Sequence, residues 1–393
     1  MIGGGIVYSF HLENSIRYFP DEAEYVLLAR NLVSQRIYSL DGLQPTAYRP
    51  PGYPAVLSVL TLVGADILHF RILNFIFLAG CVYLIGQILF QQGFPLAAIF
   101  GSLLVVTYPV LFYTSGTLYP QPLAAFLFLF LIRIFTREDV PSLDFILGGV
   151  VCGLLVLTVP TFLFAIFVVW GWFWVYGKFP HVKSYLLTLA IAILIIGIWT
   201  GRNYSVFGSL FFVSTNSGEN LLIGNSENTT PNAGTTVDIS SYLKNSVGLG
   251  EVERDRYLSG QAINYITTHP VASLKLYLQK VINYFNFRNE LVTVSEASRV
   301  RDILMIFSYG PLITVFFLRI LLIKKIKPTP VEILFILLYI LSALITAIFF
   351  SRIRFRLPFD YLVIMVVAIT LERVVRFILQ GKTAFSSLHF LRS

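Results

Sequence analysis

Two short polar stretches stand out near the start of this sequence: PDEAEY at residues 20–25 and AYRPPGYP at residues 47–54. The first holds two adjacent acids, Asp21 and Glu22, and the second places Arg49 directly before two prolines. Almost everything that follows consists of long apolar runs. Because charged groups beside a membrane are costly unless they have a partner or a task, these two stretches are the first candidates for function.

The composition places the chain in a membrane. Hydrophobic residues make up 56% and charged residues only 13% of the 393 residues, whereas a soluble domain carries about 25% charge. The formal net charge of +8 could favour nucleic acid. However, the lysines and arginines sit in short gaps between apolar runs, as they do in cytoplasmic loops. The sequence therefore predicts an integral membrane protein with membrane lipids around it and no nucleic-acid partner.

The residues that usually hold metals are scattered. Cys81 and Cys152 each lie inside an apolar run and have the character of small core residues. The five histidines are dispersed, and Asp21 and Glu22 form an isolated pair of neighbouring carboxylates. We therefore predict no metal site and no cofactor.

Apolar runs of near-membrane length predict the main body of the protein. Nine of them fall at about residues 71–91, 95–113, 120–136, 145–158, 160–176, 184–201, 302–323, 331–350 and 357–379. The fourth and fifth are short and nearly contiguous across Pro160. Residues 5–10 resemble the last turns of an apolar helix whose beginning is missing, which suggests a truncated or unusual start.

Two shorter helices are expected before the first of these spans. Residues 21–35 have an amphipathic pattern with Tyr25, Leu28 and Leu32 on one face, and residues 54–68 are apolar but short. Both suit a position along the membrane interface, or a re-entrant segment in the second case. The predicted fold is thus an all-α, polytopic transmembrane protein with interfacial helices in its first extracytoplasmic loop.

We divide the chain into four segments on this basis. They are a truncated first helix with an extracytoplasmic loop (1–70), a transmembrane bundle (71–201), an extracytoplasmic segment (202–301), and C-terminal transmembrane helices with a cytoplasmic tail (302–393). The third segment is predicted to hold two helices, at about 251–268 and 271–286. It has no cluster of His, Asp or Cys, so it is better suited to covering a site than to housing one.

Basic residues give the orientation. If the spans alternate, one side collects Arg133, Arg137, Lys178, Lys183, Lys324, Lys325, Lys327, Arg373, Arg376 and Lys382. The positive-inside rule makes that side the cytoplasm. Asp21, Arg49 and the arginines at 352, 354 and 356 then lie outside. These last three run against the rule, and we weigh a functional role equally with contact to lipid phosphates.

Asp21 has two compatible interpretations. With Glu24 three residues later it matches a helix N-cap and its capping-box partner. A carboxylate partly shielded from water at the membrane face would also have a raised pKa and could act as a general base toward a hydroxyl. Glu22 could assist it or be solvated.

Arg49 suits an anion. The prolines that follow it fix the backbone and so aim the guanidinium, and a fixed arginine can hold a phosphate through bidentate, charge-assisted hydrogen bonds. The alternative is ordinary contact with lipid headgroups. A base and a phosphate anchor on the same outer side indicate group transfer from a lipid phosphate.

Four groups of motifs, spread over nearly the whole chain, support this interpretation. They are DEAEY at 21–25 with ARNL at 29–32; YRPPGYP at 48–54 with RILN at 71–74; Trp199, RN at 202–203, STNSG at 214–218 and LIGN at 222–225; and YI at 265–266, HP at 269–270 and RFRLP at 354–358. In this order the chain resembles the polytopic lipid-phosphate-sugar glycosyltransferases of the GT-C superfamily. That superfamily includes the protein O-mannosyltransferases and the aminoarabinose transferase acting on lipid A.

The resemblance implies an inverting membrane glycosyltransferase with a GT-C-like architecture. It would move a sugar from a polyprenyl-phosphate donor to a hydroxyl of a lipid, glycan or protein acceptor on the extracytoplasmic face of a bacterial inner or plasma membrane. Asp21, with Glu22 beside it, corresponds to the catalytic acid of the family's first loop, and Arg49 to the basic residue that holds the donor phosphate. The further residues assigned to the phosphate are Tyr48, Arg202, Arg352, Arg354 and Arg356.

Several departures from the family pattern are visible. The family's first transmembrane helix is nearly absent. Residues 119–122, YPQP, stand where an acidic residue is expected at the start of the third span, and Val159 stands in place of an arginine. The large C-terminal soluble domain of some relatives is also missing, so the choice of acceptor cannot be carried over.

Two readings from other classes remain. A polytopic transporter would place ionisable or broken-helix elements near the membrane midplane and often shows inverted repeats. Here the interiors of the predicted spans are nearly free of charge, and no convincing internal repeat is visible. A non-catalytic lipid-binding membrane protein, such as a receptor or scaffold, is the other alternative.

Overall fold

The fold is helical throughout the part of the chain that the structure describes. The computed structural model describes residues 1–13, 15–16, 20–137, 140–176, 182–232, 234, 236–288 and 299–380, and no strand occurs among them. The prediction of an all-α membrane protein with several apolar helices is confirmed. Lys178 and Lys382, which were used for the predicted orientation, lie outside the described residues.

Long apolar helices form one set of elements. Among the described residues, three helices are long and apolar enough to cross a membrane, namely α4 (Ile67–Gln91), α10 (Val182–Phe207) and α15 (Arg299–Leu321). A fourth candidate is the pair α5 (Pro95–Val106) and α6 (Pro109–Ser115), which is bent by 59°. The bend falls where Tyr108, before Pro109, takes an extended backbone conformation, because a residue before proline is disfavoured in the helical region.

The remaining apolar helices are shorter or carry charges. They are α3 (Gly52–Leu62), α7 (Gln121–Phe135), α8 (Ser142–Thr158), η1 (Pro160–Phe162) with α9 (Leu163–Tyr176), α16 (Pro330–Thr346) and the 28-residue α17 (Ile353–Gln380). All nine predicted apolar runs therefore coincide with helices, but fewer of these helices are full-length spans than we predicted. Among the short ones, α7 is covered by its neighbours and buries most of its side chains.

Close helix packing builds the core. Helix α8 lies along α10, and Gly149 permits the approach because a Cβ there would meet the Thr188 carbonyl oxygen at 2.7 Å. Helix α17 is central: it packs on α5, α7, α15 and α16, and its side chains from Pro358 to Ile369 are buried. The predicted break at Pro160 is also present, with Val159 in an extended conformation.

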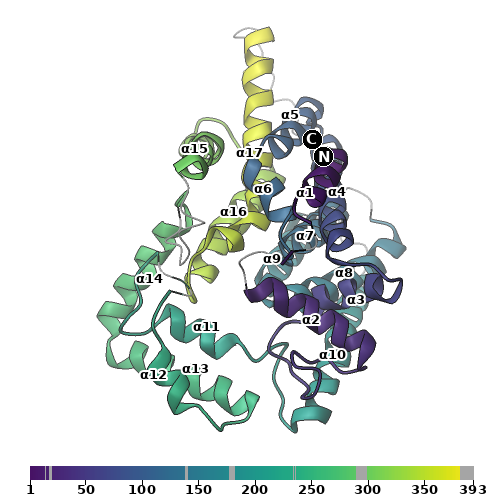
Figure 1. Ribbon diagram of the computed structural model, residues 1–393. Coiled ribbons are helices and arrows are strands. Elements are labelled where there is room, and N and C mark those ends of the chain that lie inside the picture. Colours follow the sequence, from purple (N-terminus) through teal and green to yellow (C-terminus); the bar gives the residue numbers. More distant parts are fainter. Residues whose placement is uncertain are drawn as a thin grey trace.

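Polar helices gather at one end of the molecule. They are α2 (Pro20–Ser34), α11 (Ser217–Gly224), α12 (Ser240–Asn245), α13 (Glu251–Thr268) and α14 (Pro270–Tyr284). Figure 1 shows α2, α11, α12 and α13 at the same end, opposite the projecting end of α17, with α1 (Ile2–His11) near α4. The predicted helices at 21–35, 251–268 and 271–286 correspond closely to α2, α13 and α14. The division into four segments and the orientation in the membrane stay predictions.

Candidate functional site

A carboxylate held between two arginines marks the candidate site. Asp21, in the first turn of α2, accepts a hydrogen bond from Arg49 Nη2 at its Oδ1 and from Arg354 Nη1 at its Oδ2, both at 2.6 Å. The three side chains are 14% to 23% exposed. We call Arg49, Asp21 and Arg354 the outer triad. It joins a helix, a loop and the start of the central helix α17, so its geometry is fixed by three separate parts of the fold.

The local role predicted for Asp21 was a helix cap, and the structure corrects this. Asp21 lies inside the first turn of α2, which begins at Pro20, rather than before it. Its supposed capping-box partner Glu24 instead accepts a hydrogen bond from Arg49 Nε at 2.5 Å. Asp21 and Glu24 therefore both accept hydrogen bonds from Arg49 and do not cap the helix.

Side chains from other parts of the chain fix the loop that carries Arg49 through hydrogen bonds. The Tyr38 hydroxyl donates to the Arg49 carbonyl at 2.9 Å, and Arg202 Nη1 donates to the Thr46 carbonyl at 2.9 Å. Glu251, at the start of α13, accepts from Thr46 Oγ1 and from the backbone N–H of residue 47, each at 2.7 Å. Together with the two prolines, these bonds fix the direction in which Arg49 projects.

Of the predicted phosphate ligands near Arg49, two occupy supporting positions. The Arg202 guanidinium lies 4.9 Å from the Trp199 ring centroid and bonds to the loop backbone, away from the cavity described below. The guanidinium carbon of Arg49 lies 5.1 Å from the centroid of the Tyr48 ring. The Tyr48 hydroxyl donates a hydrogen bond to Glu219 at 3.2 Å. Both residues therefore shape the loop rather than line the cavity.

The three arginines at the start of α17 diverge. Arg354 faces Asp21, with its guanidinium 5.0 Å from the Tyr119 ring centroid. Arg356 is fully buried, pairs with Asp360 at 3.0 Å, and donates to the carbonyl oxygens of residues 284 and 286. Arg352 is half-buried and lies near residue 234. Arg352 precedes α17, and Arg354 and Arg356, two apart on the helix, do not share a face. Of the three, Arg354 is the one that bonds to Asp21.

Glu22 does not accompany Asp21. Its side chain is fully buried, and its Oε1 accepts the backbone N–H of Leu118 at 2.8 Å. This bond ties α2 to the turn that precedes α7. The pairing of Asp21 and Glu22 at one cavity, predicted from their adjacency, is therefore not what the structure has.

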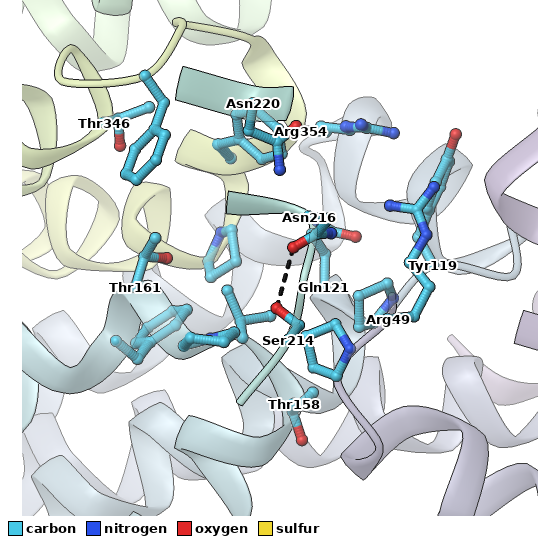
Figure 2. Close-up of a pocket in the computed structure, with 18 of the residues that line it drawn as sticks. Arg49, Tyr119, Gln121, Thr158, Thr161, Ser214, Asn216, Asn220, Thr346 and Arg354 are labelled. Atoms are coloured by element: carbon cyan, nitrogen blue, oxygen red, sulfur yellow. Dashed lines mark hydrogen bonds between the residues drawn. The ribbon is translucent and has the colours of Figure 1, made fainter. Parts of the chain in front are cut away.

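A cavity of about 220 Å³ opens beside the outer triad. Figure 2 shows Arg49, Arg354 and Tyr119 on one side of it and Thr161 and Thr346 on the other. One part of the wall is polar and is formed by Gln121, Ser214, Asn216, Ser217 and Asn220. Another part is aromatic and is formed by Phe162, Phe164, Phe349, Phe350, Phe355 and Phe359. The cavity thus places two cations, a carboxylate, hydrogen-bonding amides and an apolar surface around one space.

Sequence reasoning missed most of this wall. The motif STNSG at residues 214–218 contributed only to the resemblance and was given no role, yet it supplies much of the polar part. Tyr119 and Gln121 stand where an acid was expected, and both line the cavity. Polar residues in the otherwise apolar surroundings of residues 119–122 were a usable signal.

The charges of the site favour ionised groups. Burial alone would raise the pKa of Asp21, but the charges of Arg354 and Arg49 and their hydrogen bonds outweigh it, so the pKa lies below its ordinary value. The raised pKa that we expected for a partly shielded carboxylate is therefore wrong. Burial acts to lower the pKa of Arg49, yet its interactions with Tyr25, Asp21 and Glu24 raise it overall. Both of these groups stay charged at neutral pH.

The structure was also searched for groups of side chains that could bind a metal ion. Within the described part of the chain, no three His, Cys, Asp or Glu side chains gather closely enough to hold an ion.

The fold and this site together define an all-helical membrane protein with an arginine-bracketed carboxylate at the mouth of a cavity. No protein-family model matches the sequence, and a search of curated proteins finds no relative. Among solved structures, the chain is similar to ArnT from Cupriavidus metallidurans bound to undecaprenyl phosphate. The two share 12% identity over 96% of this chain and 78% of that one, with a TM-score of 0.45.

It is also similar to the same ArnT in the apo state, at 11% identity over 95% of this chain and 76% of that one, with a TM-score of 0.40. ArnT is an aminoarabinose transferase of the GT-C family, the group that the sequence motifs resemble.

Proposed function

We propose that this protein is a membrane glycosyltransferase that moves a sugar from a polyprenyl-phosphate donor to an acceptor hydroxyl. The observation that carries the proposal is the outer triad, in which Asp21 bridges Arg49 and Arg354 beside a cavity with polar and aromatic walls. Asp21 is the general base, and the two arginines hold the donor phosphate.

A phosphodiester fits the two arginines. Guanidinium groups bind phosphate through paired, charge-assisted hydrogen bonds. Arg49 and Arg354 are already oriented toward one small anion, the Asp21 carboxylate. A phosphate oxygen beside this carboxylate could therefore accept hydrogen bonds from both guanidinium groups without their reorientation. Because these side chains keep 14% and 23% exposure, such an anion can reach them from the cavity.

Donor binding would also activate the base. In the free protein both oxygens of Asp21 accept hydrogen bonds from guanidinium groups, which keeps the pKa of this carboxyl low. A phosphate that takes over part of this bonding leaves a carboxylate oxygen available and adds a nearby negative charge, which raises the pKa of Asp21. The carboxylate thus becomes a stronger base only when the donor is in place.

The transfer step then follows. The acceptor oxygen attacks the anomeric carbon of the sugar as its proton moves to Asp21. The bond between that carbon and the phosphate oxygen breaks, and its electron pair leaves with the polyprenyl phosphate, where Arg49 and Arg354 stabilise the negative charge. Attack opposite the leaving group inverts the anomeric centre. The amides of Asn216 and Asn220 suit the sugar hydroxyls, and the aromatic wall suits the first units of the polyprenyl chain.

The site is proposed to face the extracytoplasmic side, because the basic loops predicted at the other end follow the positive-inside rule. Labelling from one side of the membrane tests this. Leu43→Cys and Lys325→Cys replace exposed residues, and we expect a membrane-impermeant maleimide to reach Leu43→Cys only from outside and Lys325→Cys only from inside. Labelling of both from the same side would contradict the orientation.

Binding and turnover are the test of the function itself. In lipid nanodiscs, undecaprenyl phosphate binding is measured by native mass spectrometry, and transfer by the release of polyprenyl phosphate from radiolabelled donors carrying different sugars. We expect Arg49→Gln combined with Arg354→Gln to abolish binding, and Lys275→Gln, an exposed control on α14, to have no effect. Equal binding by the double variant and the wild type would refute the phosphate assignment.

The alternative of a non-catalytic lipid-binding protein has one observation in its favour, namely that Asp21 is fully engaged by the two arginines. The same assays separate the two functions. Binding that depends on both arginines, without turnover of any polyprenyl-phosphate sugar, would favour the lipid-binding protein.

A further inference from the structure

Residues 214–225 connect the two parts of the protein that carry the arginines of the outer triad. The segment includes α11, and its polar side chains face the cavity. At its beginning, the Thr215 backbone N–H donates to the Ala47 carbonyl at 3.0 Å, and Thr215 Oγ1 donates to Glu251. Glu251 also binds the loop backbone at residue 47. The start of the segment is thus joined to the loop that carries Arg49.

The end of the segment is joined to the turn that leads into α17. Asn225 Nδ2 donates to the Ile348 carbonyl at 2.8 Å. Gly224 lies so close to this turn that a Cβ on it would be 1.9 Å from the Phe349 carbonyl oxygen. The contact leaves no room for a side chain, so the separation between α11 and the turn is set by their backbones.

A buried lysine from a third element closes this junction. Lys280 of α14 is 1% exposed, and its Nζ donates to the carbonyl oxygens of Gly224 and Phe349, each at 2.8 Å, and to Asn225 Oδ1 at 3.2 Å. The Ser351 hydroxyl donates back to the Lys280 carbonyl at 2.8 Å. An ammonium group has three donors, and all three are used here on the two segments that meet.

This arrangement is unusual for a lysine. Within the described residues no carboxylate forms an ion pair with it, and burial lowers its pKa to about 7. A buried charge without a counter-ion is unfavourable unless its hydrogen bonds are satisfied. Lys280 therefore suits a junction that must be held in one geometry.

We infer that residues 214–225 act as a strut that sets the distance between Arg49 and Arg354, and that Lys280 is a positioning residue which fixes the far end of this strut. The strut itself is argued from contacts alone, whereas its consequence for ligands rests on the proposed binding of a donor phosphate by the two arginines. If the end near Phe349 loosens, Arg354, five residues later, loses its fixed place opposite Arg49. Phosphate affinity should then fall although no residue that touches the phosphate has changed.

The test pairs Lys280→Met with Lys275→Met, which changes an exposed lysine five residues earlier on the same helix. Spin labels on Leu43→Cys and Ile348→Cys, both exposed in the wild type, report the distance across the strut by electron–electron double resonance. The native Cys81 and Cys152 are buried and label poorly. Binding of undecaprenyl phosphate in nanodiscs is measured on the same preparations without labels.

We expect Lys280→Met to broaden the distance distribution and to weaken binding on the order of tenfold, whereas Lys275→Met changes neither. Asn225→Ala keeps the lysine but removes the bond to Ile348 and one of the three bonds that Lys280 donates. It should give a smaller change in the same direction, and it serves if Lys280→Met does not fold. An unchanged distribution in the variant that folds would overturn the strut. A broadened distribution with unchanged affinity would overturn the positioning role, provided that Arg354→Gln weakens binding.

Arg354→Gln in the otherwise wild-type chain separates the two proposals. If this variant binds undecaprenyl phosphate as tightly as the wild type, the proposed function is wrong, and the distance distribution alone then decides whether the strut exists.

Discussion

The described part of the protein contains the same arrangement of charges in two places. In the outer triad Asp21 lies between Arg49 and Arg354, and at the other end of α17 Glu332 lies between Arg319 and Arg373. We call this second group the inner triad. Its carboxylate is 3.1 Å from Arg319 Nε and 2.5 Å from Arg373 Nη2.

Their surroundings differ. Glu332 is fully buried and also accepts hydrogen bonds from the backbone N–H and hydroxyl of Thr329, so its oxygens are enclosed by donors. Asp21 is 20% exposed and borders the cavity. An arginine–carboxylate–arginine group is therefore not evidence of a ligand site by itself. What distinguishes the outer triad is the empty space into which a competing anion can come.

The largest expected effect tests whether only the outer triad is catalytic. Asp21→Asn should lower sugar transfer by about 10²–10⁴-fold, because an amide cannot accept the proton of the acceptor hydroxyl. The same variant should bind undecaprenyl phosphate more tightly, since it removes the carboxylate that competes for the arginines. Initial rates in liposomes, normalised to folded protein, measure the first effect. Near-normal turnover would remove Asp21 from the mechanism.

The second largest expected effect is a loss of stability when the inner triad is changed. Glu332→Gln removes the fully buried counter-ion of Arg319, which is itself 1% exposed, and of the partly buried Arg373, and should lower the free energy of unfolding by about 3–5 kcal/mol. Asp21→Asn should cost less stability, because its arginines can be solvated from the cavity. Thermal unfolding in one detergent compares the two variants. A larger loss in Asp21→Asn than in Glu332→Gln would contradict the contrast between sealed and accessible triads.

A smaller effect sharpens the role of the guanidinium fork. Arg49→Lys keeps the charge but cannot bond to Asp21 and Glu24 through two separate nitrogens as Arg49 does. We expect undecaprenyl phosphate affinity to fall about tenfold, equivalent to ~1.4 kcal/mol. Titration in nanodiscs measures this. An unchanged dissociation constant would mean that a point charge is sufficient.

The smallest effect is a pH dependence. The pKa of Asp21 is lower in the folded protein than its ordinary 3.8. Such a group stabilises the fold above its unfolded pKa and loses this contribution as the pH falls through the lower folded value. The stability difference between wild type and Asp21→Asn should thus be constant above about pH 5 and shrink only below about pH 4. A difference that already changes between pH 5 and 7 would contradict the lowered pKa.

Much of the fold could be predicted from sequence because hydrophobic length and proline positions act locally. The break at Pro160 and the helices α2, α13 and α14 were all predicted close to their observed bounds. The number of full spans was not, because a short apolar helix such as α7 is covered by protein instead of lipid. That covering depends on the neighbours, which the sequence does not reveal.

The candidate site was predicted only in part, because the sequence does not reveal which neighbour each side chain meets. Asp21, Arg49 and Arg354 meet as expected, but Glu22 turns away because successive helical residues point in directions about 100° apart. Arg356 is two residues from Arg354 and faces Asp360 on another side of the helix. The inner triad was missed because Arg373 looked like an ordinary basic residue of a cytoplasmic loop. Which face of a helix meets which neighbour is a property of the packed bundle.

The bond between Asp21 and Arg354 joins residues that are 333 positions apart in the chain. At ordinary rates of synthesis, residue 354 follows residue 21 by roughly 20–70 s. During that interval the growing chain has Asp21 and Arg49 but not the second arginine, so it holds half of the proposed phosphate site. The outer triad is therefore complete only when α17 has been inserted into the bundle. On the proposed function, a nascent chain that stalls before this helix would lack a complete donor site, so binding at this site would indicate that assembly is complete.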